Sequence, residues 1–359
     1  MKKIYSVIKG TGSYIPEKVV KNEDFLNNTF YENYDKPITE RDTAEVIQKF
    51  YEITGIKERR YVTDGLGNSD IATIAAQRAI ETSNIDPETL DYIILGHNYG
   101  EAKNGTNVDI VPSIAARVKN KLKIKNPWCV AYDLPFGCPG WVQGLIQADY
   151  YIKSGDVKRI LVIGSEILST FMDPYDRDSM IFADGAGAVV LEATESQQPI
   201  GIISHVTRTD AGDATFYIYD NHSLNSQKAD EYKFTIKMYG RKVYEYALTN
   251  VPAVAKMAID KANLNITDIK KVLIHQANEK MDDAIISRLL KLYGIRQVPE
   301  NLMPMTIGWL GNSSVATIPT MLDLILKNNF PPHSISKGDH IVLTSVGAGM
   351  HINAVVYKF

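Results

Sequence analysis

The chain has 359 residues, of which 45% are hydrophobic and 23% are charged, the balance of a protein that folds around a sizeable core. Its net charge of −3 gives no basic footprint for nucleic acid, and no apolar run is long enough to span a membrane. The N-terminus lacks the apolar stretch of a signal peptide, and the two cysteines, Cys129 and Cys138, form no CxxC motif. We therefore expect a cytoplasmic protein.

Two stretches of the chain carry the same pattern, residues 73–95 and residues 252–274. In both, apolar residues at helical spacing lead through a turn into a short acidic helix and then into an apolar strand, which is typical of a largely parallel sheet covered on both faces. The halves also close alike, because Gly-rich turns at 184–187 and 347–349 both lead into a strand. Such repetition indicates duplication. We predict an α/β fold built from two similar halves, residues 1–194 and 195–359.

Three polar segments fall outside this repetition, residues 27–45, 100–109 and 209–231. We predict that they are surface excursions, which in α/β enzymes often line the site. The last is rich in Asp, Asn and Tyr and is a candidate for covering the site entrance. The sequence leaves the roles of the last two segments open.

Cys138 lies between a predicted strand at 128–132 and a predicted helix at 142–152. At the start of a helix, backbone N–H groups and the helix dipole favour a thiolate. The small neighbours Gly137 and Gly140 would let a substrate approach closely. The alternative is a buried structural thiol.

Two further polar residues stand at comparable places. His275 follows the apolar strand 272–274, and Asn312 precedes a helix of small residues. We predict that these residues and Cys138 lie at strand-to-helix junctions, where open α/β sheets bind their ligands. The cysteine would accept an acyl group, while the His Nε2 and the Asn amide would donate hydrogen bonds to the oxygen of an enolate. The alternatives are a structural histidine and a helix-capping asparagine.

The Gly-rich turns carry less chemistry. The turn at 347–349 could present a backbone N–H to an oxyanion, or could only need a positive φ. The segment 184–187 is interpreted as structural, because no Lys-Ser or Lys-Thr follows it as in a phosphate loop. The seven histidines show no metal-ligand spacing, so we expect no metal site.

Over nearly its whole length the chain resembles the β-ketoacyl-acyl-carrier-protein synthase III family of the thiolase superfamily. The resemblance rests on Cys138 and on segments that occur in the family's order: Gly10–Pro16, Thr54–Arg60, Asp173–Arg177, Asp184–Gly187, His275–Asn278, Gly311–Ser314 and Gly347–Gly349.

The resemblance implies a thiolase-like, five-layered αβαβα fold and a homodimer. It implies an acyltransferase of fatty-acid or polyketide-type biosynthesis that performs a decarboxylative Claisen condensation through acyl-Cys138, with His275 and Asn312 as the other catalytic residues. Backbone N–H groups of Cys138 and Ala348 would hold the tetrahedral oxygen. Acyl carrier protein or coenzyme A thioesters would be the substrates, with no cofactor. Substrate contacts are implied for four residues: Arg177, Asn278, Gly347 and Val111.

The chain also departs from the family pattern. Lys49 and Ile53 stand where a Trp and an Arg grip the adenine of coenzyme A, and Glu245 replaces a Lys that helps to dock the carrier protein, although Lys280 remains basic. The segment before Val111 is longer than usual. These departures favour a specialised relative, a ketosynthase/cyclase that joins two β-ketoacyl units to a cyclohexanedione or dialkylresorcinol precursor.

Related synthases add a glutamate base, for which Glu101 in the inserted loop is a candidate. Two alternatives belong to other classes: an acyltransferase to a hydroxyl or amine, and a non-catalytic partner subunit. The presence of Asn312 argues against the first, and the presence of Cys138 argues against the second. Acyl chain length, the choice between carrier protein and coenzyme A, and ring closure are left open.

Overall fold

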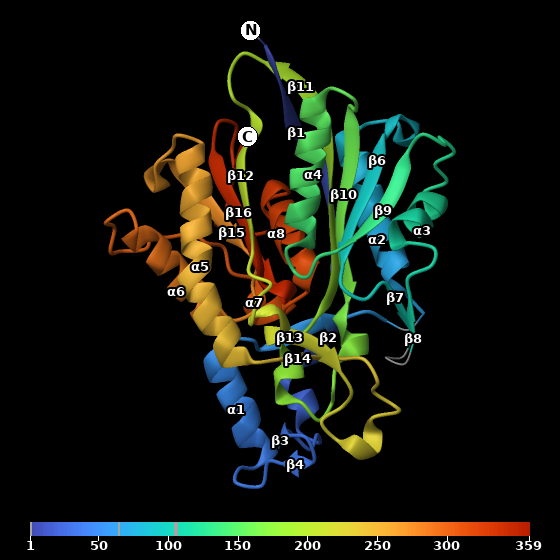
Figure 1. Cartoon of the computed structure of the whole chain (residues 1–359), viewed down its shortest axis with the longest axis vertical. Helices are drawn as coiled ribbons and strands as arrows, with labels where there is room; N and C mark the ends of the chain where they lie inside the picture. Colours follow the sequence, from blue (N-terminus) through green and yellow to red (C-terminus); the bar gives the residue numbers. More distant parts are fainter. Residues whose placement is uncertain (1, 64, 104–106) are drawn as a thin grey trace.

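The fold is built on two mixed β-sheets that stand side by side (Figure 1). The structure is a computed structural model that describes residues 2–63, 65–103 and 107–359. The strands of the first sheet are, in spatial order, β1 (Lys3–Tyr14), β11 (Asp184–Ser196), β10 (Arg159–Ile167), β6 (Tyr92–His97) and β9 (Val130–Pro135). The strands of the second sheet are β12 (Gly201–Thr209), β17 (His351–Lys358), β16 (His340–Gly347) and β15 (Ile269–Ile274).

The two sheets repeat one order of strands. β12, β17, β16 and β15 occupy the places that β1, β11, β10 and β6 occupy in the first sheet. The expectation of largely parallel sheets holds for every strand but one in each sheet, because β11 and β17 run antiparallel to both of their neighbours while the other strands share one direction. β17 follows β16 after the short connection 348–350, which reverses the chain direction, whereas β11 follows β10 after the longer connection 168–183. The boundary between residues 194 and 195 stays a prediction.

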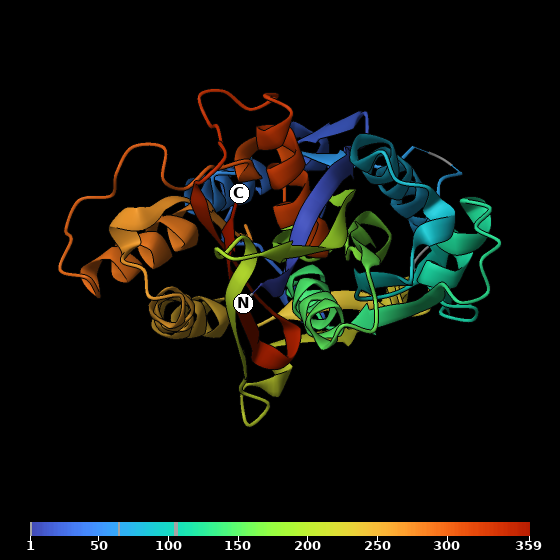
Figure 2. The same cartoon turned by 90° about the horizontal axis from the view of Figure 1, so that it is seen from above.

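Six helices complete the predicted five layers. One pair covers the outer face of the first sheet, one pair lies between the sheets, and one pair covers the outer face of the second sheet (Figure 2). In this order the pairs are α2 (Asn68–Ser83) with α3 (Ile114–Lys121), α4 (Gly140–Ser154) with α8 (Thr317–Leu326), and α5 (Gly240–Lys261) with α6 (Glu279–Lys291). Residues 317–325 of α8 are all buried, as expected for a helix enclosed on every side.

The three segments outside the repetition contain short strands rather than only loops. Residues 104–106 of the segment 100–109 lie outside the described residues. The short strands within these segments are β3 (Tyr31–Asn33), β4 (Lys36–Pro37), β7 (Glu101–Lys103), β8 (Asn107–Asp109) and β13 (Ile218–Asn221). Three more short strands lie outside them: β2 (Lys18–Lys21), β5 (Glu58–Tyr61) and β14 (Thr235–Met238). The other α-helices are α1 (Thr43–Thr54) and α7 (Ile307–Leu310).

Short 3-10 helices occupy several of the connections. They are η1 (Asn22–Phe25), η2 (Pro87–Thr89), η3 (Leu168–Phe171), η4 (Arg177–Ile181), η5 (Thr215–Tyr217), η6 (Ser226–Lys228), η7 (Ile266–Asp268), η8 (Ser314–Ala316) and η9 (Ala348–Met350). None of the helices in the described part of the chain combines the length and the apolar character needed to cross a bilayer. The cytoplasmic location stays a prediction.

The Gly-rich segment 184–187 is the start of β11 and not a turn. Here α8 lies directly on the strand. A Cβ atom on Gly187 would stand 2.7 Å from Cβ of Pro319 and 2.8 Å from the backbone nitrogen of Thr320. The glycine is needed because it lets the central helix approach the sheet, so the structural interpretation of this segment fits its packing.

We predict that Gly187→Ala destabilises the protein. The added methyl group must push α8 away from β11, and overpacking of this kind costs about 1–3 kcal/mol. The free energy of unfolding, measured by urea titration, should fall by that amount. Gly212→Ala is the matched control, because nothing lies within 4 Å of its added Cβ atom. Equal effects of the two substitutions would contradict the packing argument.

Candidate active site

Cys138, His275 and Asn312 line one cavity of about 280 Å³, which we call the catalytic cavity. Each comes from a different part of the chain, so the fold alone brings them together. Much of the remaining lining is apolar: Leu168, Ile181, Phe182, Ile218, Ile236, Met238, Val243, Met281 and Val346. The cavity can therefore hold an acyl chain next to a thiol.

Cys138 lies between β9 and α4, two residues before the helix begins at Gly140. The residue is half-buried, and burial raises the pKa of its thiol to about 11, while a hydrogen bond from the Ser314 hydroxyl opposes this rise. The expected thiolate is therefore not the resting form at neutral pH. In this site desolvation outweighs the advantage of the helix start.

His275 follows β15, and its backbone N–H donates to the carbonyl of Thr344 at 2.9 Å. Its side chain is buried, its Nδ1 has no hydrogen-bond partner in the described part of the chain, and burial lowers the pKa of the imidazole to about 4. The imidazole is neutral at pH 7. It then carries one N–H and can donate one hydrogen bond to a substrate oxygen without bringing a charge into the cavity.

Asn312 does not follow a strand, so this part of the prediction is wrong. The residue follows the short helix α7 and is held by the backbone on both sides of Phe182: its N–H donates to Ile181 at 2.9 Å, and its carbonyl accepts from Ala183 at 2.8 Å. The side-chain Oδ1 accepts from the Ser314 N–H at 2.8 Å. This leaves the amide N–H groups as the donors that Asn312 can offer to the cavity.

Gln276 joins the segment of His275 to the segment of Asn312. Its Oε1 accepts from the backbone N–H groups of Thr306 and Ile307, at 2.8 and 3.0 Å, and its Nε2 donates to the carbonyl of Pro304 at 2.7 Å. These bonds fasten the start of α7, which leads directly to Asn312. The glutamine thus fixes the distance between the two donors.

Gly347 and Ala348 lie against the backbone of the nucleophile. A Cβ atom on Gly347 would stand 2.6 Å from the nitrogen of Cys138, so only glycine permits this approach. Ala348 lines the cavity. The predicted oxyanion donors, the N–H groups of Cys138 and Ala348, therefore belong to neighbouring segments, and the lack of a side chain on Gly347 permits their approach. The assignment of Gly347 as a substrate contact stays a prediction.

A second cavity of about 420 Å³ adjoins the first and shares with it Ile181, Met238, Val243, Ala277 and Met281. We call it the entrance cavity. Asn278 and Arg177 line it, and Asn278 also caps α6 by accepting from the Met281 N–H at 3.0 Å. Lys49 and Ile53 of α1 line it as well. Four cationic side chains surround it: Arg41, Lys49, Arg177 and Arg241.

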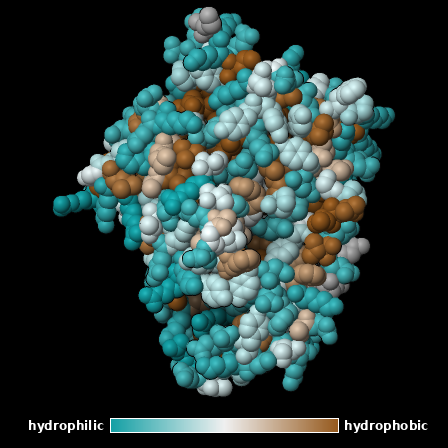
Figure 3. All heavy atoms as spheres, in the orientation of Figure 1, coloured by the Kyte–Doolittle hydropathy of each residue, from teal (hydrophilic) through white to brown (hydrophobic). Residues whose placement is uncertain are grey.

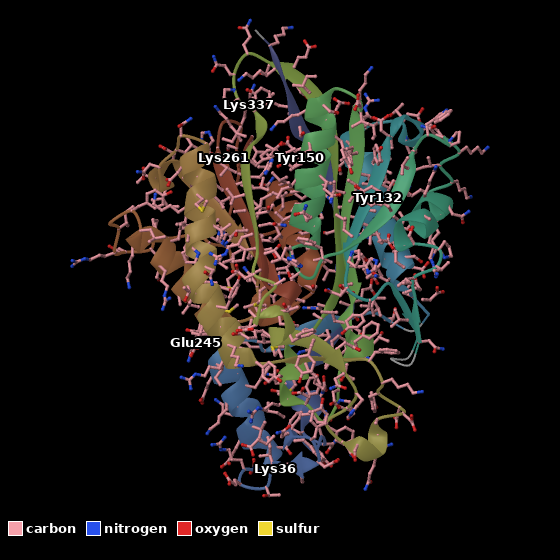
Figure 4. All side chains as sticks on the ribbon, viewed as in Figure 1. Lys36, Tyr132, Tyr150, Glu245, Lys261 and Lys337 are labelled. Carbon is pink, nitrogen blue, oxygen red and sulfur yellow. The ribbon has the colours of Figure 1, made fainter. Side chains whose placement is uncertain are left out.

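Two residues from the sequence analysis lie elsewhere. Val111 is 79% exposed and lines neither the catalytic nor the entrance cavity, so its assignment as a substrate contact depends on a second chain. Glu245 is exposed on α5, where Figure 4 labels it, and pairs with Arg241 at 2.9 Å. This ion pair places a carboxylate beside one cation of the entrance cavity.

The strands β13 and β14 form a hairpin-like pair that supplies one wall of the catalytic cavity. We call this pair the β13–β14 flap. The buried Lys237 fastens it, because its Nζ lies 2.5 Å from Asp173 and 3.2 Å from Asp176. The flap brings Asp220 to the cavity, where Asp220 accepts a hydrogen bond from the Tyr99 hydroxyl at 3.1 Å. Part of the segment 209–231 therefore lines the site.

Glu101 does not line the catalytic cavity. Its Oε2 accepts from the Ser69 N–H at 3.0 Å, and Arg117 lies 3.9 Å away. Asp220 is the acid that lines the cavity, and Glu166 lies behind the lining, where its charge acts on Cys138 and burial raises its own pKa to about 7. The sequence carried one signal for it, a charged residue at the carboxyl end of an otherwise apolar strand.

The comparisons with known proteins identify a family. The profile of 3-oxoacyl-[acyl-carrier-protein] synthase III matches residues 132–211, and the profile of its C-terminal domain matches residues 259–359. The chain is 32% identical to the β-ketoacyl-[acyl-carrier-protein] synthase III of Prochlorococcus marinus (strain MIT 9215), over 98% of this chain and 96% of that protein.

Solved structures give the same answer for the fold. The 3-oxoacyl-[acyl-carrier-protein] synthase III of Aquifex aeolicus VF5 superposes with a TM-score of 0.78 at 29% identity, covering 99% of this chain and 100% of that one. The priming β-ketosynthase of the R1128 polyketide pathway superposes with a TM-score of 0.81, covering 100% of this chain and 97% of that one. At 24% identity the second comparison shows the fold alone. The predicted thiolase-like fold is confirmed.

Proposed function

The chain belongs to the 3-oxoacyl-[acyl-carrier-protein] synthase III family, and we propose that it catalyses a decarboxylative Claisen condensation of acyl thioesters through an acyl-Cys138 intermediate. Membership of this family makes it an acyl-transferring, condensing enzyme. The observation that carries the finer proposal is the cavity in which one thiol faces a neutral imidazole and a carboxamide.

The first half-reaction would load the enzyme. The sulfur of Cys138 attacks the carbonyl of an acyl thioester, and the thiol proton leaves with the departing thiol. The backbone N–H groups of Cys138 and Ala348 would hold the oxygen of the tetrahedral intermediate. The acyl group then remains on the cysteine.

The second half-reaction would form the carbon–carbon bond. A thioester with a β-carboxylate loses CO₂, and the electron pair of the broken bond passes to the thioester oxygen, which His275 and Asn312 hold as an enolate. The enolate carbon attacks the acyl-cysteine, and the sulfur of Cys138 leaves and takes up a proton. Two neutral donors suit this step because the negative charge moves from the carboxylate to the thioester oxygen only as the enolate forms. The scheme requires neither a metal nor a redox cofactor.

The entrance cavity suits donors that carry a phosphate on a long arm. Its cationic residues would attract the anionic end of a coenzyme A or carrier-protein thioester. Its apolar side chains would contact the chain that links the phosphate to the thioester near Cys138. Arg177 and Asn278 are the proposed contacts. Lys49 and Ile53 offer no aromatic surface on which an adenine could stack.

We predict that Asn312→Ala separates the two half-reactions. Loading should persist, because Asn312 takes no part in it, whereas condensation and CO₂ release should fall by about 10²–10³-fold, the usual effect of removing one oxyanion donor. Intact-protein mass measures the acyl adduct, and trapped CO₂ measures decarboxylation. Cys138→Ala is the control and should show no adduct.

Other outcomes would identify other functions. Acyl transfer to a hydroxyl or amine without CO₂ would indicate the acyltransferase alternative. No adduct from any acyl or β-ketoacyl thioester, on the native chain and Cys138→Ala alike, would contradict the nucleophile and favour a non-catalytic subunit.

A specific observation favours the ketosynthase/cyclase as a second candidate. Tyr99 and Asp220 form a hydrogen-bonded pair on the wall of a largely apolar cavity, and the Tyr99 ring is stacked on Phe171 at 3.8 Å between ring centres. A plain acyl chain has no use for a carboxylate at this wall. When two β-ketoacyl units are joined, the carbon between two carbonyls is acidic, and Asp220 would take its proton. The carbanion would then attack the remaining thioester carbonyl and close the ring, and the thiol of that thioester would leave and take up a proton.

Asp220→Asn tests this candidate. The amide cannot accept a proton from carbon, so we expect that the open-chain product accumulates and that ring closure falls at least about tenfold, within the usual range for loss of a general base. Mass spectrometry of the products from two β-ketoacyl thioesters measures the ratio. Asn225→Ala, on the same segment but away from the cavity lining, is the control. An unchanged ratio would remove Asp220 from the mechanism.

We also propose that the enzyme is a homodimer joined along β9. This strand is at the edge of the first sheet, so one side of its backbone is free to pair with a second copy. Trp128 and Val130 beside it are 85% and 47% exposed. Figure 3 shows further hydrophobic side chains gathered where Figure 1 places β8 and β9, and Figure 4 labels Tyr132 and Tyr150 on the same side.

Val130→Asp should convert the dimer to a monomer, because it places a charge on the paired edge. Light scattering coupled to size-exclusion chromatography measures the mass. Val19→Asp, at a 38% exposed valine on the separate strand β2, should remain dimeric. A native chain that elutes as a monomer would contradict the proposal.

A further inference from the structure

Ser314 lies among the three proposed catalytic residues. Its N–H donates to Oδ1 of Asn312 at 2.8 Å, and it lines the same cavity as Cys138 and His275. Its side chain acts on Cys138 by lowering the pKa of the thiol, against the effect of burial. Its φ is +53°, an uncommon value for a residue with a side chain.

A serine hydroxyl can rotate, and its direction depends on its other partner. Here that partner is Asn98, which follows β6 and whose Nδ2 donates to the Ser314 Oγ at 3.0 Å. Since the oxygen already accepts this bond, its own hydrogen is left for Cys138. Donation to sulfur favours the developing thiolate over the thiol.

Asn98 is in turn held by Glu166 on β10. The Glu166 Oε2 accepts from the backbone N–H of Asn98 at 2.8 Å and from its Nδ2 at 2.5 Å. A carboxylate accepts hydrogen bonds and cannot donate them, so it determines which end of the amide carries the nitrogen. Glu166 is 1% exposed, which keeps water from competing for these bonds.

We propose that Asn98, oriented by Glu166, is a positioning residue that makes the Ser314 hydroxyl a hydrogen-bond donor to the sulfur of Cys138. The inference rests on the proposed role of Cys138 as nucleophile and adds the groups that prepare the nucleophile. Glu166 has two opposing effects, because its charge disfavours a thiolate while its hydrogen bonds orient Asn98. The other ionisable groups around this hydrogen-bond network are His275, which is neutral, and the pair His97 and Asp133 beside Glu166. Tyr99 and Asp220 on the cavity wall complete the set.

The test is the rate at which iodoacetamide alkylates Cys138 between pH 8 and pH 10, where Glu166, with a pKa of about 7, is ionised, followed by intact-protein mass. Over this range the logarithm of the rate rises with pH, and a change in the thiol pKa displaces the line along the pH axis. We expect Asn98→Ala and Ser314→Ala each to slow alkylation about fivefold at every pH, the change expected from one ordinary hydrogen bond. The double variant should be no slower than either single variant.

Two substitutions of Glu166 separate orientation from charge. Glu166→Gln keeps an oxygen that can accept from Asn98 and removes the negative charge, so alkylation should be as fast as in the native chain or faster. Glu166→Ala removes both the charge and the anchor of Asn98, and alkylation should be slower. If charge alone mattered, both variants would react faster, and that result would overturn the proposal.

Two other results would overturn the proposal. One is that Asn98→Ala and Ser314→Ala slow alkylation independently, so that their effects multiply in the double variant, and the other is that Asn98→Ala reacts as fast as the native chain. Asn98→Leu, of similar volume and without polar atoms, replaces Asn98→Ala if the latter does not fold, which thermal melting reveals. Cys138→Ala gives the background from Cys129, which is buried. Because alkylation requires no condensation, this result is independent of the proposed reaction.

Discussion

The two sheets share one layer of helices, and the tight packing of that layer is the constraint on which the site depends. α4 and α8 are enclosed between the sheets, with α8 so close to β11 that Gly187 has no room for a methyl group. Cys138 stands just before α4, while Asn312 and Ser314 stand just before α8. Because both helix starts are fixed by the same packing, the thiol and the carboxamide are held at one separation, and β15 of the second sheet adds His275.

Burial then decides the charge state of the site. It raises the pKa of Cys138 and lowers the pKa of His275, so both groups are neutral at rest. A charged pair would need more solvation than this cavity offers. In the proposed reaction, neutral hydrogen-bond donors would therefore stabilise the negative charge on the substrate oxygen when the enolate forms. This agrees with a buried polar network in which Gln276 and Ser314 hold the donors in place.

The sequence was sufficient for features set by local pattern and insufficient for features that depend on packing. Repeated periodicity predicted the α/β class, and the apolar strands before Cys138 and His275 placed both residues correctly at strand ends. Asn312 was misplaced because its support is a single bridge to Phe182, which leaves no periodic signal. Glu166 was overlooked in favour of Glu101, since both acids are buried and only the pairing of β10 with β6 brings Glu166 to Asn98.

The β13–β14 flap has a consequence for how such enzymes diverge. It lines the catalytic cavity, yet it lies outside the hydrogen-bonded ladders of both sheets and is attached through Lys237 to Asp173 and Asp176. Substitutions at residues such as Ile218 or Asp220 would change the lining of the cavity without disturbing the duplicated frame or the three proposed catalytic residues. Under the proposed function, descendants of one ancestral gene could therefore acquire new acyl preferences in this flap while the condensing chemistry is kept.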